Sequence, residues 1–373
     1  MGDARIMVIK IGSSTLVAAA GVLDRAYLAN LADEVVKVRE LGWSPVIVSS
    51  GAIACALPIL GFGKRPSDMP SLQAAASVGT NILFSGYAEE FGKRGILTST
   101  VLLTRGTTAH RESYLHARDT LLRLVELGVV PVVNENDAIS VDQIKFGDND
   151  TLAALVSCLI KADVCVLFSD IDGLYTANPS ADPDARFIER VEKITPEVMA
   201  LAGGVGSSVG SGGMITKLRA ARVLMVAGIK MVICHGRKSG SLVKLASGEP
   251  VGTLFDNPSK PHEITPRKLW IALGNSVRGS VFVDDGAKRA LVARGSSLLP
   301  VGMTDVEGSF VPGDVIDIKD AQGRVIGRGM AGASSSEAEL ACGRSQTRIQ
   351  ENELFRDLAK RPMVHRDELV VFD

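Results

Sequence analysis

The sequence has little charge imbalance, few aromatic residues and no long apolar run. Its 373 residues carry 41 Lys and Arg against 42 Asp and Glu, a formal net charge of −1. This balance argues against a broad electrostatic footprint for nucleic acid or acidic membranes. The apolar stretch at residues 52–60 is far shorter than the roughly 18–20 residues that span a bilayer, and residues 1–11 lack the cleavage site of a signal peptide.

Cysteines are few, and their spacing argues against a disulfide framework or a metal site. The five cysteines are odd in number and contain no CxxC pair. We therefore predict free thiols in a reducing, cytoplasmic compartment. The five histidines form no spaced constellation, so no catalytic or metal role is assigned to them. The cysteines are Cys55, Cys158, Cys165, Cys234 and Cys342.

Short apolar runs alternate with helix-length segments over the first two-thirds of the chain. The runs are almost continuously hydrophobic, which is typical of parallel strands buried on both faces. The pattern predicts an α/β fold, an open, mostly parallel sheet sandwiched by helices. The predicted strands are 5–11, 45–49, 100–103, 129–133, 164–168 and 230–234. The predicted helices are 24–41, 71–91, 111–127, 150–161 and 214–227.

The pattern changes after about residue 251. Residues 253–261 carry two prolines and several polar side chains, which indicates the end of a domain. Shorter predicted strands follow at 280–283, 315–319 and 324–330, separated by Asp-Gly, Pro-Gly and Gln-Gly turns. We predict a first domain at 1–257, a linker at 258–278 and a small β-rich domain with a tail at 279–373.

Ligands of an open α/β sheet bind beyond the carboxyl ends of its strands. The segments that follow the predicted strands, or precede the later helices, are polar and rich in glycine: 10–14, 49–52, 134–137, 145–150, 169–173 and 210–214. Glycine at a strand-to-helix junction lets the backbone approach phosphate oxygens, and the first N–H groups of the helix favour an anion. Ser50-Gly51 and Gly212-Gly213, together with Lys10 and Lys217, therefore predict phosphate binding at more than one point.

These junctions are not standard nucleotide motifs. Neither has the GxxxxGK[ST] pattern of a P-loop or the GxGxxG pattern of a dinucleotide fold. A single glycine pair is usually a turn, and Lys10 can be a solvated lysine at a strand end. Because an unpaired ammonium group within a buried strand is costly, we favour a function for Lys10.

The acidic and amide residues also have structural interpretations. Asp148 and Asp150 flank Asn149 and can cap the helix that follows, although capping occupies one of the three. Asp137 and Ser169-Asp170 can be turn residues, and their pattern alone leaves both interpretations open.

Six ordered motifs make the sequence similar to a known family. They are Lys10-Ile-Gly-Ser-Ser14, Val48-Ser-Ser-Gly-Ala52, Leu103-Thr-Arg105, Val133-Asn-Glu-Asn-Asp137, Lys145-Phe-Gly-Asp-Asn-Asp150 and Gly212-Gly-Met-Ile-Thr-Lys217. From about residue 5 to 256 the chain resembles the amino acid kinase family, and most closely its members that act on glutamate. The later segments Val283-Asp-Asp-Gly-Ala287, Arg294-Gly-Ser-Ser-Leu-Leu-Pro300 and Pro312-Gly-Asp314 resemble a PUA domain.

The resemblance implies a phosphotransferase with a carboxyl group as acceptor. The implied reaction is ATP-dependent phosphorylation of the γ-carboxylate of L-glutamate to L-glutamyl 5-phosphate, at the start of proline biosynthesis. It also implies Mg²⁺ held mainly through ATP, with no protein ligand assigned to the metal, as well as feedback inhibition by proline and a homo-oligomer, dimer or tetramer. Ser169 stands where threonine is frequent in the family, which leaves the details of the nucleotide pocket open.

The resemblance places three groups of residues at the site. Those at the transferring phosphoryl group are Lys10, Lys217 and Asp150. Those at glutamate are Ser50, Gly51, Asn134, Asp137, Asp148 and Asn149. Those at ATP are Lys10, Ser169, Asp170, Ser211, Gly212, Gly213, Met214 and Lys217.

The chemistry of a carboxylate acceptor agrees with this set. A glutamate side chain has a reference pKa of about 4.3, so it is already ionised and needs no general base. The difficulty is to bring one anion onto another. Lysine ammonium groups, Mg²⁺ and backbone N–H groups neutralise that charge, and positioning supplies much of the remaining effect.

Two alternatives stay open at this point. Aspartate, N-acetylglutamate, carbamate or UMP can be the acceptor on the same fold. Asp137 favours an acceptor with a free ammonium group, which N-acetylglutamate, carbamate and UMP lack. The other alternative is RNA binding through the C-terminal domain. Residues 262–373 carry 15 Lys and Arg against 16 Asp and Glu, so attraction of RNA by charge is poorly supported and a regulatory or assembly role is favoured.

Overall fold

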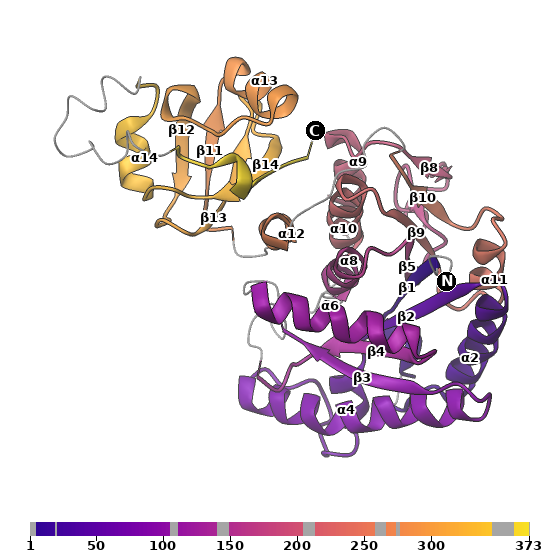
Figure 1. Ribbon diagram of the computed structural model, residues 1–373. Coiled ribbons are helices and arrows are strands. Elements are labelled where there is room, and N and C mark those ends of the chain that lie inside the picture. Colours follow the sequence, from indigo (N-terminus) through magenta and orange to yellow (C-terminus); the bar gives the residue numbers. More distant parts are fainter. Residues whose placement is uncertain are drawn as a thin grey trace. The chain divides into compact units, whose positions relative to one another are not determined.

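The chain forms two compact units, Met1–Glu263 and Ile264–Asp373, both drawn in Figure 1. The computed structural model describes residues 5–18, 21–104, 111–139, 149–203, 213–257, 266–273, 277–344 and 362–372. Among these residues, no helix combines the length and the apolar character that crossing a membrane requires.

One large sheet forms the centre of the first unit. The strands of this unit are β1 (Arg5–Ile11), β2 (Trp43–Ser49), β3 (Thr98–Leu103), β4 (Val130–Glu135), β5 (Val164–Ser169), β6 (Leu174–Tyr175), β7 (Phe187–Ile188), β8 (Arg190–Val191), β9 (Lys230–His235) and β10 (Thr253–Phe255). In the described residues the sheet has the order β3-β4-β2-β1-β5-β9-β10-β8, and β6 pairs with β7 separately. Strands β3, β4, β2, β1, β5 and β9 run parallel to one another. Strand β10 is antiparallel to β9 and parallel to β8. The predicted open, mostly parallel sheet is confirmed, and each predicted strand matches an observed one to within two residues.

Helices cover both faces of this sheet (Figure 1). They are α1 (Ser13–Leu16), α2 (Arg25–Glu40), α3 (Ala52–Ala56), α4 (Met69–Gly92), α6 (Arg111–Glu126), α8 (Asn149–Leu159), α9 (Pro196–Ala200), the 3₁₀ turn η1 (Leu201–Gly203), α10 (Met214–Val226) and α11 (Ser241–Ala246). Helices α2, α4 and α11 lie on one face, and α6, α8 and α10 lie on the other. The five predicted helices correspond to α2, α4, α6, α8 and α10.

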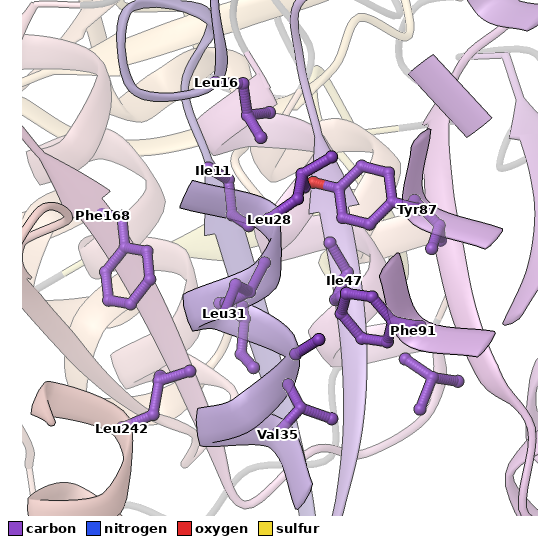
Figure 2. Close-up of a cluster of buried hydrophobic side chains, with 14 of the residues drawn as sticks. Ile11, Leu16, Leu28, Leu31, Val35, Ile47, Tyr87, Phe91, Phe168 and Leu242 are labelled. Carbon is purple, nitrogen blue, oxygen red and sulfur yellow. The ribbon is translucent and has the colours of Figure 1, made fainter. Parts of the chain in front are cut away.

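The alternation of side chains along β1 decides which face Lys10 occupies. Successive side chains of a strand point to opposite faces of the sheet. Met7, Ile9 and Ile11 belong to the buried cluster between the sheet and helices α2 and α4, which Figure 2 shows around Ile11. Lys10 therefore points to the opposite face, where α8 and α10 pack.

Residues at the ends of α2 and α4 explain where these helices begin. The Asp24 carboxylate accepts a hydrogen bond from the Tyr27 N–H at 2.9 Å, and Asp68 accepts one from the Ser71 N–H at 2.9 Å. Such N-caps satisfy N–H groups that lack a partner within the helix. Gly42, at φ 81°, follows α2 in the left-handed conformation that favours glycine.

Helices α3 and α4 approach each other closely at Gly79. A Cβ atom at this position would overlap the carbonyl oxygen of Ala52, the first residue of α3. Only a residue without a side chain allows this distance between the two backbones. The contact fixes the start of α3, and with it the turn that follows β2.

We expect Gly79→Ala to destabilise the first unit by roughly 1–3 kcal/mol, because the methyl group forces α3 and α4 apart in a packed interior. Gly92→Ala is the matched control. Gly92 is the last residue of the same helix, it is exposed, and a Cβ there meets no atom within 4 Å. Thermal unfolding of both variants checks this, and equal melting temperatures would contradict the close approach.

The second unit is a small β-rich body. Its strands are β11 (Gly279–Val283), β12 (Met303–Gly308), β13 (Val315–Lys319), β14 (Val325–Met330) and β15 (Leu369–Val371), in the order β12-β11-β13-β14-β15 within the described residues. Its helical segments are α12 (Pro266–Leu273), α13 (Asp285–Arg294), η2 (Pro300–Gly302), α14 (Ser335–Ala341) and η4 (Arg366–Glu368). Helix α12 lies inside the range predicted as a linker, and the Ala272 carbonyl accepts a hydrogen bond from Arg328 of β14 at 3.1 Å.

Candidate active site

Strand register brings Lys10, Ser50 and Ser169 to one edge of the sheet. Lys10 of β1 pairs with Val48 of β2 on one side and with Leu167 of β5 on the other. Ser50 and Ser169 therefore each lie two residues beyond the level of Lys10, on either side of it. Because the strands are parallel, their carboxyl ends meet at the same edge, as the sequence argument expected.

Lys10, Asp150 and Lys217 form a buried ionic cluster. The Lys10 Nζ lies 2.7 Å from Asp150 Oδ1, and the Lys217 Nζ lies 2.9 Å from Asp150 Oδ2. The three side chains are 9%, 0% and 6% exposed in the order Lys10, Asp150, Lys217. Three elements that are distant in the sequence, β1, α8 and α10, thus meet at one carboxylate.

The charges of this cluster do not cancel. Burial by itself raises the pKa of the Asp150 carboxyl, but the ammonium groups of Lys10 and Lys217 outweigh it and hold the pKa well below its usual range. One carboxylate faces two ammonium groups, so the cluster has a net charge of +1 within the described residues. An excess buried charge is costly without a counter-ion, and an anion such as a phosphoryl group supplies one.

Asn149 holds a second cluster, one residue before Asp150. Its Nδ2 donates to the Ser49 carbonyl at 2.7 Å, to Ser50 Oγ at 2.8 Å and to Asn134 Oδ1 at 3.1 Å. These bonds tie the start of α8 to the ends of β2 and β4. Two consecutive residues of α8 therefore contact different groups: Asn149 binds Ser50, and Asp150 binds the two lysines.

The turn after β2 depends on Gly51. It precedes α3 with φ at +100°, a conformation that residues with a side chain rarely adopt. The Ser50 N–H donates to the Ile11 carbonyl at 3.0 Å, which ties this turn to the end of β1.

Asp137 lies half-buried in the loop after β4, three residues beyond Asn134. Burial raises the pKa of Asp137 to about 6, against the opposite effect of the Arg65 guanidinium. A raised pKa means that the protein does not fully offset the free-energy cost of removing the ionised carboxylate from water. A cationic group of a ligand would provide that compensation.

The predicted nucleotide side is described in part. Ser169 ends β5, and its hydroxyl donates to the carboxylate of the exposed Asp170 at 3.1 Å. Met214 is the first residue of α10, and its N-cap, Gly213, has no side chain to bond the first N–H groups of the helix, an arrangement that suits phosphate oxygens. The predicted residues Asp148, Ser211 and Gly212 lie outside the described residues.

A family model described as the amino acid kinase family matches residues 5–235, which are most of the first unit. The chain belongs to the amino acid kinase family. A second model, described as a PUA domain, matches residues 279–351. Both resemblances predicted from the sequence are confirmed.

Relatives named glutamate 5-kinase match this member of the amino acid kinase family over its whole length. One from Ralstonia pickettii (strain 12J) is 44% identical over 371 residues, which cover 100% of this chain and 98% of the relative. One from Delftia acidovorans (strain DSM 14801 / SPH-1) is 44% identical over 380 residues, with 99% and 97% covered.

Two residues with contacts at or near the carboxyl edge of the sheet were not singled out from the sequence. The Thr216 hydroxyl lies 2.9 Å from Asp150 Oδ2 and 2.7 Å from the Gly213 carbonyl, so it ties the start of α10 to the ionic cluster. Arg237, after β9, donates to the Thr15 carbonyl at 3.0 Å and pairs with Asp24 at 3.1 Å, which holds α1 against the start of α2. Arg237 follows the carboxyl end of β9, and this position after a strand is the signal by which the sequence could have indicated it.

The described residues contain no group of three His, Cys, Asp or Glu that would hold a metal ion. Both oxygens of Asp150 already face ammonium groups, and the positive cluster disfavours a divalent cation bound to Asp150 directly. These residues fit a Mg²⁺ ion that is held through nucleotide phosphates and water, as is usual for this metal.

Proposed function

We propose that this chain phosphorylates the γ-carboxylate of L-glutamate with ATP to give L-glutamyl 5-phosphate, the first step of proline biosynthesis. The observation that carries the proposal is the buried cluster of Lys10, Asp150 and Lys217, with its excess positive charge at the carboxyl edge of the sheet. The full-length likeness to glutamate 5-kinases supports glutamate as the acceptor.

The transfer is an in-line displacement. An oxygen of the γ-carboxylate forms a bond to the γ-phosphorus of ATP, and the bond from that phosphorus to the β–γ bridging oxygen breaks. ADP leaves with the electron pair, and no proton is transferred. Lys10 and Lys217 stabilise the negative charge of the transferring group, and Asp150 orients both ammonium groups rather than acting as a base. Mg²⁺ supplies further positive charge at the phosphates when it is bound.

Glutamate occupies the side of the site around Asn149. The Ser50 hydroxyl, the Gly51 N–H and the Asn134 side-chain N–H groups supply donors for a carboxylate. Asn149 acts on glutamate by holding Ser50 and Asn134 in place. Asp137 pairs with the α-ammonium group. We also assign Asp148 to glutamate binding, as the sequence motif implies. ATP lies on the other side, along Ser169, Asp170 and residues 211–217, where α10 begins.

Trapping of the acyl phosphate tests this function. Hydroxylamine converts an acyl phosphate to a hydroxamate that is measured by its colour with iron(III). We expect ATP, Mg²⁺ and L-glutamate to give hydroxamate, with L-aspartate and N-acetyl-L-glutamate giving at least tenfold less. Hydroxamate from aspartate but not from glutamate would overturn the choice of acceptor, and none from any carboxylate would overturn the reaction class.

The pH dependence of glutamate binding tests the role of Asp137. The substrate ammonium group needs the ionised carboxylate, so we expect the KM for glutamate to rise as pH falls below about 6, the pKa of Asp137. Asp137→Asn raises this KM by about 10- to 100-fold, the ratio for a lost charged hydrogen bond, and removes the pH dependence. The KM for ATP in the same assays is the control. An unchanged glutamate profile in the variant would exclude Asp137 from the ammonium site.

The raised pKa of Asp137 also determines how the stability of the fold changes with pH. The pKa of Asp137 is raised from 3.8, so the folded chain binds the proton more tightly than the unfolded chain does. Without glutamate, the cost of ionising Asp137 therefore appears as pH rises from about 4 through 6. Glutamate offsets this cost, so its stabilisation of the fold against heat is greater at pH 7 than at pH 5.

Further properties of the family are part of the proposal. We expect proline to act as a feedback inhibitor and the chain to form a dimer or tetramer in the cytoplasm. We assign the first domain, 1–257, to catalysis and the PUA domain within 279–373 to regulation or assembly. The near-neutral charge of residues 262–373, with 15 basic against 16 acidic residues, supports this assignment over RNA binding.

A further inference from the structure

A buried tyrosine reaches the acceptor side of the site from the hydrophobic core. Tyr87 of α4 is fully buried in the cluster between α4, α2 and the sheet, where Figure 2 shows it with Leu28 and Ile47. Its hydroxyl lies 3.0 Å from the Oγ of Ser49, which is also fully buried and is the last residue of β2. A polar contact thus joins the core to the residue that precedes Ser50.

Ser49 and Ser50 have different partners because successive side chains of a strand point to opposite faces. Ser49 pairs in register with Ile11, which belongs to the α2 and α4 cluster, and its hydroxyl accordingly meets Tyr87. Ser50 Oγ instead accepts from Asn149 of α8. The two serines therefore connect the core on one side with the proposed glutamate side on the other.

The direction of the hydrogen bonds follows from the number of protons. The Ser49 hydroxyl donates its single proton to the Ser50 carbonyl at 3.1 Å. Its oxygen is then an acceptor toward Tyr87, so the Tyr87 hydroxyl is the donor. Burial raises the pKa of Tyr87, which keeps that proton on the hydroxyl. The chain of bonds runs from Tyr87 through Ser49 to the Ser50 carbonyl.

We propose that Tyr87 and Ser49 are positioning residues that set the Ser50-Gly51 turn for the acceptor substrate. The turn is held from two directions, by Asn149 on the Ser49 carbonyl and Ser50 hydroxyl, and by Ser49 on the Ser50 carbonyl. Neither Tyr87 nor Ser49 touches substrate. Without the Tyr87 hydrogen bond, the Ser49 hydroxyl is free to rotate, and the Ser50-Gly51 turn becomes less rigid. This turn lies on the acceptor side, so we expect glutamate binding to weaken far more than ATP binding. This inference rests on the proposed function, because it assigns Ser50 to glutamate.

Tyr87→Phe tests the proposal, with Tyr27→Phe as its matched control. Tyr27 of α2 packs against the same cluster, but its buried hydroxyl has no hydrogen-bond partner among the described residues. Both substitutions remove one buried hydroxyl and keep the ring. We expect Tyr87→Phe to raise the KM for glutamate by about two- to tenfold, the ratio that corresponds to one net hydrogen bond. The KM for ATP stays within twofold, and Tyr27→Phe changes neither constant.

Ser49→Ala tests the same chain of hydrogen bonds at its second residue. It raises the KM for glutamate as Tyr87→Phe does, and the double variant shows no more than the effect of Ser49→Ala, because both residues act through one bond. Melting temperatures confirm that each variant is folded. Equal effects of Tyr87→Phe and Tyr27→Phe, a parallel rise in both KM values, or additive effects in the double variant would each overturn the proposal. Wild-type enzyme that makes no hydroxamate from glutamate would instead overturn the proposed function itself.

Discussion

Replacing Lys217 or Lys10 by alanine is expected to lower the turnover number by about 10²–10⁴, the usual cost of losing an electrostatic donor at a reacting centre. Both ammonium groups lie within 3 Å of the same carboxylate, at 2.7 and 2.9 Å, and they are the buried cations of the described site. The charge that they stabilise grows as the phosphoryl group moves between two anions. Turnover at saturating glutamate and ATP is the measurement.

Arg219→Ala is the control for Lys217→Ala. Arg219 lies two residues further along the same helix, α10, and is exposed. The Arg219→Ala substitution removes one positive charge from the protein without changing the ionic cluster, so the turnover number of this variant should equal that of the wild type. A near-normal turnover number for either lysine variant would remove that lysine from the catalytic set.

The second large effect is expected for Asp150→Asn, which should lower both turnover and stability. The amide keeps the shape of the side chain but leaves two buried ammonium groups without a counter-charge. Breaking a buried ion pair in this way costs about 3–5 kcal/mol. Denaturant titration measures this loss as a lower free energy of unfolding. We also expect turnover to fall, because neither lysine is then held in place.

Lys217→Met separates stability from catalysis at the same cluster. It keeps the aliphatic stem and reduces the cluster to one ammonium group and one carboxylate, so its net charge falls from +1 to 0. We therefore expect Lys217→Met to lose activity but to be at least as stable as the wild type. If Lys217→Met and Asp150→Asn lost the same stability, the account of the cluster as an excess positive charge would be wrong.

Acid dependence gives an independent check on Asp150. Its folded pKa lies below the ordinary 3.8, so the ionised cluster contributes fully to stability above about pH 4 and loses that contribution only as pH falls further. Asp137 titrates near 6 in the opposite sense. Between pH 5 and 7, changes in glutamate binding therefore report on Asp137 and not on the ionic cluster.

Local pattern in the sequence was enough to predict the main strands and the five long helices of the first unit, and the edge of its sheet where we place the site. The strand at Arg5–Ile11 was predicted with its observed bounds, because a run of buried β-branched residues is a property of neighbouring positions. The polar residues after it were recognisable for the same reason. An unpaired lysine inside such a run indicated that a partner had to exist, and the motifs indicated the family.

The order of the strands was beyond the reach of local pattern. Nothing near β1 in the sequence shows that it lies between β2 and β5, yet this order sets Ser50 and Ser169 on either side of Lys10. Helix α12, within the range predicted as a linker, depends on contacts with strands far along the chain. Pairings of this kind are decided by long-range packing.

The sequence by itself thus determined the fold class, the family and the kinds of side chain that we propose for the site. Only the tertiary structure decided their connections: Asp150 between Lys10 and Lys217, Thr216 beside it, and Ser49 turned away from Ser50 toward Tyr87. The physical reason is distance along the chain. The pattern of apolar residues reflects the local structure of neighbouring positions. Asp150, by contrast, binds Lys10, which lies 140 positions earlier, and Lys217, which lies 67 positions later, and these contacts exist only after β1, α8 and α10 have packed together.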